Sequence, residues 1–374
     1  MVQKLLLRIL FFYFFLAAFG SFSQTYPLSP ESKVSILTCG SGEQLHSIFG
    51  HTAIRIQEPS RNIDIVYNFG MFDFRTPNFY LKFVKGDMQY FVANSSFEEF
   101  MYGYRMENRS VYEQELNFTV EQKQQIFDKL NKILFSDERF YTYKFIDKNC
   151  TTMVAEKVNE ELGKSLIQKT GNREESYRDV LNPYLTNLFY EKLGINIIFG
   201  YRTDEKAEQL FLPVELMNSL EKLQINQKPF VDKTVTLFEQ DPSLLSNSWW
   251  NTIYTFLFIL LLIALSHNNT VYLSFLVIIG LFGIFLSLVG FYSLHREVLR
   301  NYNVLLFNPF LLGIVYFYLQ KNQVWFTRLL YFVLVNFLVY FLFMLNKAHF
   351  IQMLPIFMTI AYILFRLHQN LKKA

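Results

Sequence analysis

The C-terminal third of the chain places the strongest constraint on the fold. After Trp249 and Trp250, apolar residues dominate five successive stretches, approximately Ile253–Ser266, Val271–Leu294, Val304–Leu319, Leu329–Leu345 and Phe350–Leu367. Each approaches the ~20 residues that a helix needs to cross a bilayer, although the first and third reach that length only with their flanks. Buried core helices are the alternative, but five in a row with connections as short as "HNN" favour an all-α five-helix transmembrane bundle over residues 249–374.

The N-terminus has the features of a secretory signal. Lys4 and Arg8 precede the apolar run "ILFFYFFLAAFG", and small residues follow at Gly20, Ser21 and Ser23. We therefore expect residues 1–23 to be a signal peptide cleaved before Gln24, with a retained membrane anchor as the alternative. Either interpretation exports the residues that follow, and the lack of a cysteine at the cleavage point argues against lipid anchoring of the protein itself.

Export of residues 24–248, together with five spans, predicts the orientation of the bundle. The turn near His267, the connection 321–328 and the C-terminus then lie on the cytoplasmic side. This side would collect Lys321, Arg328, Arg366, Lys372 and Lys373, as the positive-inside rule requires. One basic loop, "SLHREVLRNYN", remains outside. We expect its His295, Arg296 and Arg300 to contact lipid phosphate, with a merely solvated connection as the alternative.

Residues 24–248 have the composition and length of one α+β domain. The segments "KVSILTCG", "HTAIRIQ" and "IDIVYNFG" predict three strands, each bounded by turn-forming residues. Two helices follow, whose predicted starts are a Ser96/Glu99 and a Thr119/Gln122 capping box. The formal net charge of +3 and the absence of a Lys/Arg run exclude a nucleic-acid-binding role.

The segment "YKFIDKNCTTMVAEKV" is the candidate source of chemistry. Asn149 or Asp147 can cap a helix that ends at Gly163, which places Cys150 in its first turn. The unpaired N–H groups at a helix start favour a thiolate over a thiol. Cys150 is therefore a candidate nucleophile, provided that a base lies nearby.

Only two histidines, His46 and His51, occur in residues 24–248. His51 begins the second predicted strand and is the candidate base, although alternation puts it on the face opposite Ile54 and Ile56. Asp64 or Asn68, which share one face of the third strand, could orient its imidazole as the third member of a triad.

Three alternatives to catalysis remain open from composition. Two cysteines in an oxidising compartment are consistent with a Cys39–Cys150 disulfide. A zinc site could combine Cys39, His46, His51 and Cys150, although no C-x-x-C pair is present. His51 could also be a structural residue at a strand start.

Several motifs occur in order along the chain, namely "LTCGSGEQLHSIFGHTAIRI", "DIVYNFGMFDF", "MENRSVYEQELNFT", "YKFIDKNCTTMV", "AEQLFLPVELM" and "SLHREVLRNYNVLLFNPF". Together they resemble the Lnb family of bacterial lipoprotein N-acyltransferases. The resemblance runs from about Lys33 to the C-terminus. It implies a circularly permuted papain-like domain, akin to NlpC-type and LRAT-type enzymes, in which a strand histidine precedes a cysteine in an "NC" motif.

By this resemblance, Cys150 is the nucleophile and His51 the base of an inner-membrane acyltransferase with its catalytic domain in the periplasm. A phospholipid would donate the acyl chain, a diacylglyceryl-modified lipoprotein would accept it, and neither a cofactor nor a metal is implied. Glu107 and Arg109 could contact substrate, but an ion pair is the simpler interpretation. The residues expected to bind substrate are Cys39, Ser47, Asn149, Arg109, His295, Arg296, Arg300, Asn301 and Asn303.

Two other functions are compatible with the same residues. A Cys–His dyad could hydrolyse phospholipid or cleave a cell-wall peptide, although five spans suit a lipid substrate better. A non-enzymatic membrane sensor or assembly factor would instead use Cys39 and Cys150 as a structural disulfide.

Overall fold

The computed structural model describes residues 27–171, 174–245 and 248–373, so the predicted signal peptide and its cleavage point lie outside the described residues. The part that the sequence predicts to be exported, residues 27–171 and 174–245, is called the exported part below. It is built on one antiparallel sheet with the strand order β6-β4-β3-β2-β1-β5-β9. Its strands are β1 (Lys33–Cys39), β2 (His51–Glu58), β3 (Ile63–Met71), β4 (Gln89–Ser96), β5 (Val111–Leu116), β6 (Phe140–Thr142) and β9 (Val231–Phe238). The three predicted strands are confirmed as β1, β2 and β3. A separate ribbon pairs β7 (Gln224–Ile225) with β8 (Lys228–Pro229).

The helices of this part are α2 (Phe79–Lys85), α3 (Phe97–Met106), α4 (Val120–Leu134), α5 (Cys150–Leu162), α6 (Tyr177–Leu181), α7 (Phe189–Ile198) and α8 (Pro213–Lys222). Of these, α3 covers one face of the sheet, and α4, α5 and α8 cover the other. The predicted Thr119/Gln122 capping box begins α4, and the Ser96 side chain accepts the Glu99 N–H at the start of α3. The exported part is therefore a mixed α/β structure with an antiparallel sheet.

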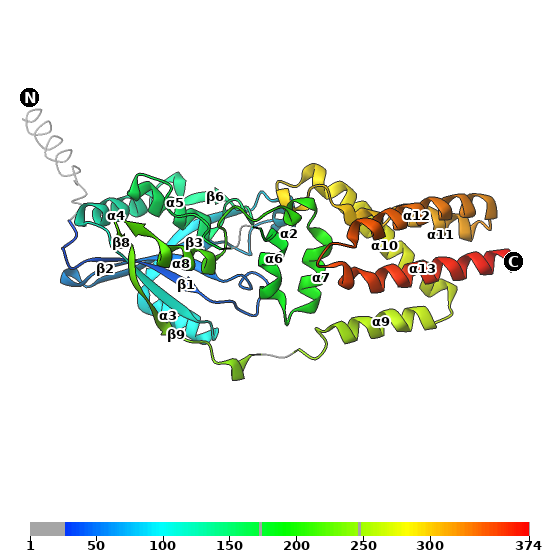
Figure 1. Ribbon diagram of the computed structural model, residues 1–374, viewed down its shortest axis with the longest axis horizontal. Coiled ribbons are helices and arrows are strands. Elements are labelled where there is room, and N and C mark those ends of the chain that lie inside the picture. Colours follow the sequence, from blue (N-terminus) through cyan, green and yellow to red (C-terminus); the bar gives the residue numbers. More distant parts are fainter. Residues whose placement is uncertain (1–26, 172–173, 246–247, 374) are drawn as a thin grey trace, which may run out of the picture.

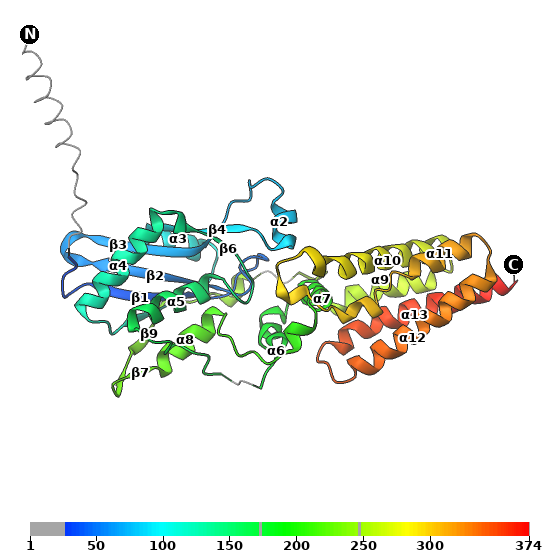
Figure 2. The same ribbon diagram turned by 90° about the horizontal axis from the view of Figure 1, so that it is seen from above.

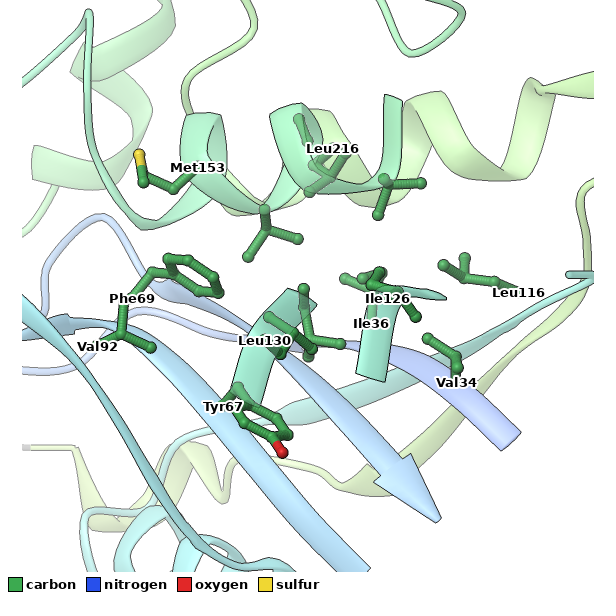
Figure 3. Close-up of a cluster of buried hydrophobic side chains, with 14 of the residues drawn as sticks. Val34, Ile36, Tyr67, Phe69, Val92, Leu116, Ile126, Leu130, Met153 and Leu216 are labelled. Carbon is green, nitrogen blue, oxygen red and sulfur yellow. The ribbon is translucent and has the colours of Figure 1, made fainter. Parts of the chain in front are cut away.

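The main core lies between the sheet and the layer formed by α4, α5 and α8. Val34 and Ile36 from β1 face Ile126 and Leu130 from α4, and Leu216 of α8 completes the layer (Figure 3). Strand alternation sends the neighbouring side chains to the other face, where a second cluster packs against α3. That second cluster contains Leu37, Cys39, Ala53, Val66, Phe100, Met101 and Val111.

All five predicted apolar segments contain a helix, but the helices differ in length. They are α9 (Ile253–Leu265), α10 (Asn269–Tyr292), α11 (Leu311–Leu319), α12 (Gln323–Met344) and α13 (Phe350–Lys373). Among the described residues, three helices are long and apolar enough to cross a bilayer, namely α10, α12 and α13. The structure thus supports three candidate spans where the sequence predicted five, because α9 and α11 are too short to qualify by themselves.

The third predicted segment is shorter than expected because its first half is irregular. Pro309 has no N–H donor and therefore cannot continue a helix that begins before it. The side-chain Oδ1 of Asn308 accepts the N–H of Phe310 at 3.0 Å, and α11 starts at Leu311. The irregular backbone is buried against α10, where a Cβ on Gly283 would lie on the Phe307 carbonyl. Irregular backbone at membrane depth is tolerated when protein surrounds it in this way.

A buried polar junction joins the exported part to the helices. Arg178 of α6 donates to Asp204 at 2.7 Å, and Asp204 accepts from the Tyr302 hydroxyl at 2.8 Å. Lys347, in the turn between α12 and α13, pairs with Asp204 at 3.0 Å. The exported part thus contacts the helices at one end, whereas the C-terminus lies at the other (Figure 1).

Candidate active site

The start of α5 is fixed by Asn149. Its Oδ1 accepts the N–H of Thr152 at 3.0 Å, which confirms it as the N-cap, and Gly163 ends the helix in a left-handed conformation. The Asn149 amide donates to the carbonyls of Phe145 and Phe211 at 2.8 and 3.0 Å. Asn149 was expected to bind substrate, but this side chain is 6% exposed and its polar atoms serve the fold.

Cys150 is the first residue of α5 and is partly buried. Burial raises the pKa of its thiol, but the neighbouring His51, the Thr52 backbone N–H and the Thr151 hydroxyl together lower that pKa below its ordinary value. Burial likewise lowers the pKa of His51, yet the interactions with Cys150 and Asn68 outweigh it and raise the pKa overall. The shifts of both groups favour a thiolate beside an imidazolium.

Asn68 is the residue that orients His51. His51 Nε2 lies 2.9 Å from Asn68 Oδ1, so Nδ1 is the ring nitrogen left for the thiol. Asp64, the other candidate, is not at the site, because both its carboxylate oxygens accept from Arg55 at 2.7 Å. Asp64 pairs with Gln57 in the sheet register, six residues from His51 and therefore about 20 Å along the strand.

Gly70 was not among the site residues predicted from the sequence, although it lies within the motif "DIVYNFGMFDF". A Cβ at this position would lie 2.8 Å from Cε1 of His51 and 3.7 Å from Cβ of Cys150. The missing side chain therefore leaves room for the His51 ring beside Cys150. This explains how His51, on the face opposite Ile54, reaches a cysteine on the helix above the other face.

Cys39 is a buried neighbour of the site and is not bonded to Cys150. Both cysteines are free thiols. Cys39 pairs with His51 across β1 and β2, and burial raises its pKa to about 12 despite a hydrogen bond with Tyr104. The disulfide alternative is therefore not formed in this structure. Within the described ranges, no group of three potential ligands is placed to hold a metal, so the zinc alternative is not assembled.

Arg109 and Ser47 line the same end of the sheet. Arg109 is 5% exposed, donates from Nε to the Gly40 carbonyl at 3.1 Å and pairs through Nη1 with Glu107 at 2.9 Å. Its Nη2 is buried without a partner among the described residues. Ser47 donates to the Gln44 carbonyl at 2.9 Å. The ion pair between Arg109 and Glu107 is the structural role that the sequence favoured. The Nη2 atom of Arg109 takes no part in that pair.

The loop between α10 and α11 is mostly an anchor, which differs from its predicted role in lipid binding. His295 Nε2 lies 3.0 Å from the Phe83 carbonyl, Asn301 donates to the Ile197 and Ile198 carbonyls, and Asn303 donates to those of Asn196 and Ile197. These three side chains hold the loop to α2 and α7.

Two arginines of this loop remain exposed. Arg296 is 65% exposed and lies 4.0 Å from Asp147, three residues before the nucleophile candidate, while Arg300 is also exposed. Of the predicted lipid-binding residues in the loop, these two are therefore the ones whose charge still faces outward.

A groove of about 1160 Å³ lies along α5 and does not include the dyad. Its lining includes Thr152, Ala155, Glu156 and Asn159, whereas Cys150 and His51 lie elsewhere. The groove therefore gives no information about the substrate of the Cys–His pair.

The comparisons with known proteins bear on the exported part. Residues 11–182 match the family described as the Lnb N-terminal periplasmic domain, a range that includes His51, Asn68, Gly70, Arg109 and Cys150. These residues are thus similar to that periplasmic domain, and the similarity together with three candidate spans indicates an inner-membrane protein with a periplasmic domain. No curated protein and no solved structure matches the chain.

Proposed function

Taking the similarity to the Lnb periplasmic domain as our premise, we propose that this chain is an apolipoprotein N-acyltransferase of the inner membrane. It transfers an acyl chain from a phospholipid, through a thioester on Cys150, to the α-amine of a lipoprotein whose N-terminal cysteine carries diacylglycerol. The observation that carries the proposal is the Cys150–His51–Asn68 arrangement beside membrane helices. The permuted papain-like fold, with histidine before cysteine in the chain, is part of this proposal.

The first half-reaction forms the acyl-enzyme. His51 Nδ1 takes the proton of Cys150, and the thiolate attacks the carbonyl carbon of a phospholipid ester. The carbon–oxygen bond of the ester breaks, the departing alkoxide takes the proton from the imidazolium, and a lysophospholipid leaves. Asn68 keeps the imidazole in the tautomer and orientation that this transfer needs.

The second half-reaction forms an amide. The free amine of the lipoprotein attacks the thioester carbonyl, the carbon–sulfur bond breaks and the proton released from nitrogen returns to the thiolate through His51. A thioester suits this exchange because it reacts readily with amines. Water competes for the same carbonyl, so the site benefits from lying against lipid.

One group can stabilise the negative charge of the tetrahedral intermediates. The Cys150 N–H is one of the donors that a helix start leaves unpaired. Arg109 acts on His51 through its charge, which adds to burial in lowering the His51 pKa against the stronger raising effect of Cys150 and Asn68.

The contacts of two loops with the exported part support the proposed orientation of the helices in the membrane. The loop 293–310 and the turn 345–349 both contact the exported part, through Leu294 N–H to the Lys85 carbonyl at 2.7 Å and through Lys347 to Asp204. Both would lie on the periplasmic side, with the C-terminus cytoplasmic. This orientation requires α9 and α11, together with their flanks, to cross the bilayer in addition to the three candidate spans. Arg296 and Arg300 are then placed to attract the phosphate of the donor.

Intact-mass measurement after incubation with phospholipid alone tests the proposal. We expect one acyl increment that maps to Cys150, retention of the increment in Cys39→Ala, and its loss in Cys150→Ala. Addition of a diacylated lipopeptide should discharge it as an N-acyl product. If folded Cys150→Ala still N-acylates the lipopeptide, the proposed function is wrong.

The same experiment separates the rival functions. A phospholipase would release fatty acid without an amide product, and a cell-wall peptidase would give no acyl increment. The sensor alternative, in which Cys39 and Cys150 form a structural disulfide, predicts neither an acyl increment nor an amide product.

A further inference from the structure

The segment between β3 and β4 exposes apolar side chains at the junction with the membrane helices. Its short helix α2 has no buried residue, and Tyr80 and Leu81 are 77% and 71% exposed. Phe74 and Phe83 are also exposed. Such a concentration of apolar surface on one small element marks an interaction site.

The neighbours of α2 identify membrane lipid as the occupant of that surface. The Lys85 carbonyl accepts from Leu294 N–H at 2.7 Å and the Val84 carbonyl accepts from the Ser293 hydroxyl at 2.8 Å, just beyond the end of the candidate span α10. In both views α2 lies between the sheet and α10 (Figures 1 and 2). The apolar side chains of α2 are therefore exposed beside the end of α10, where Phe291 is also 87% exposed.

The composition of α2 suits the bilayer interface. Tyrosine settles at the headgroup level, with its ring in the apolar region and its hydroxyl in water. Lys82 and Lys85 occupy the last turn and supply positive charge where phosphate groups lie.

A continuous series of aromatic rings joins α2 to the site. The ring centroid of Phe79 lies 4.9 Å from that of Phe74 and 5.9 Å from that of Phe72. The ring centroids of Phe72 and Tyr90 are 5.0 Å apart. Tyr90 in turn stacks on Tyr143 at 4.3 Å. Burial raises the pKa of Tyr90 and Tyr143, and the charge of the nearby Cys150 raises it further. Phe72 packs against the same core as Cys150. We call Phe72, Phe74, Phe79, Tyr90 and Tyr143 the aromatic path.

From this continuity we infer that α2 is seated in the membrane interface and that the aromatic path binds the acyl chain of a membrane lipid on its way to Cys150. The inference rests on the proposed function for the identity of the chemistry, but the seating of α2 is independent of it. The path gives the acyl chain an apolar surface, so the ester can leave the bilayer while its chain stays out of water.

The seating of α2 is tested by spin labelling in lipid nanodiscs. The full-length Cys150→Ser variant retains only the buried Cys39, and a nitroxide is attached in turn to Leu81→Cys and to Phe135→Cys. Phe135, 83% exposed at the end of α4, is the matched control. We expect the label at 81 to be accessible to dissolved oxygen and shielded from a water-soluble nickel chelate, and the label at 135 to show the reverse. Equal chelate accessibility at both sites would overturn the inference.

The role in substrate delivery is tested in the active chain. The double variant Tyr80→Ser/Leu81→Ser should slow acylation of Cys150 by phospholipid vesicles by about tenfold, because two apolar anchors are lost. Its reaction with a water-soluble short-chain ester should be unchanged, and Phe135→Ser should change neither rate.

The outcomes distinguish the two proposals. If the wild type reacts with the soluble ester but never with phospholipid, the proposed function fails while the spin-label result still decides the seating of α2. If the wild type reacts with both and the double variant retains the full vesicle rate, the inferred role of α2 in delivering the acyl chain is wrong.

Discussion

The Nε2 atom of His51 lies 2.9 Å from Oδ1 of Asn68, and this contact determines which ring nitrogen remains for Cys150. Asn68 comes from β3, His51 from β2 and Cys150 from α5, so three elements supply one functional group each. Sheet register therefore decides the geometry of the candidate site, and the predictions below follow from it.

Replacement of Asn68 should impair catalysis, while replacement of Asp64 should not. Asn68→Ala frees the imidazole to rotate, and a misplaced base costs about 10- to 100-fold in the rate of Cys150 acylation. Asp64→Ala removes an ion pair with Arg55 far from the thiol, so the rate should stay within about twofold. Acylation rates measured by mass spectrometry check both variants. Equal losses in the two would contradict the assignment of Asn68.

Gly70→Ala should reduce activity by displacing the His51 ring, since the new methyl group would lie 2.8 Å from its Cε1. Gly103→Ala is the control, because nothing lies within 4 Å of its added methyl group and a helical Gly→Ala change adds about 0.5–1 kcal/mol of stability. Circular dichroism melts and acylation rates should separate the two variants. Normal activity in folded Gly70→Ala would exclude the proposed role of this gap.

The pH dependence of Cys150 alkylation should depend on His51. The imidazolium lowers the pKa of Cys150 whereas burial raises it, so His51→Ala removes the lowering influence and leaves burial in place. The midpoint of iodoacetamide labelling should therefore move from below the ordinary cysteine value to above it. Peptide mapping is the measurement, and Cys39, with a pKa of about 12, should remain unlabelled in both proteins. An unshifted midpoint would show that His51 does not act on the thiol.

The loop between α10 and α11 should separate into anchors and exposed charges. Asn303 is fully buried and also accepts from the Tyr340 hydroxyl at 2.9 Å, so Asn303→Ala should cost about 1–3 kcal/mol of unfolding free energy by leaving partners unsatisfied. Arg296→Ala and Arg300→Ala should change stability little, because both side chains are exposed. Thermal melts in detergent measure stability. If Arg296→Ala and Arg300→Ala also leave acylation by anionic phospholipid unchanged, the loop has only its anchoring role.

Local signals made part of this site predictable from the sequence. The N-cap at Asn149 and the stop at Gly163 depend on residues within α5 itself, so the position of Cys150 was predicted correctly. His51 was also found, because few histidines precede the apolar region. The choice between Asp64 and Asn68 required the register between β2 and β3, which alternation by itself does not provide.

Tertiary packing explains the remaining differences. Gly70 matters because of a ring from another strand, and no pattern within β3 reveals that ring. The polar side chains of His295, Asn301 and Asn303 suggested ligand binding, but their partners are carbonyls on α2 and α7, which lie far away in the sequence. The sequence shows one reason for the late start of α11, which is Pro309. It does not show that the irregular backbone before α11 packs closely against Gly283 of α10.

The buried junction around Arg178 also has a mechanical consequence. Arg178 donates to Asp204, to the Asn196 side chain and to the Thr203 hydroxyl, and Asp204 binds groups from the loop before α11 and the turn before α13. These links cross between the two parts of the chain independently of the connection 239–252. The exported part is thus attached to the helices at a second point. This attachment fixes the distance between Cys150 and the membrane helices, which a single flexible connection would leave variable.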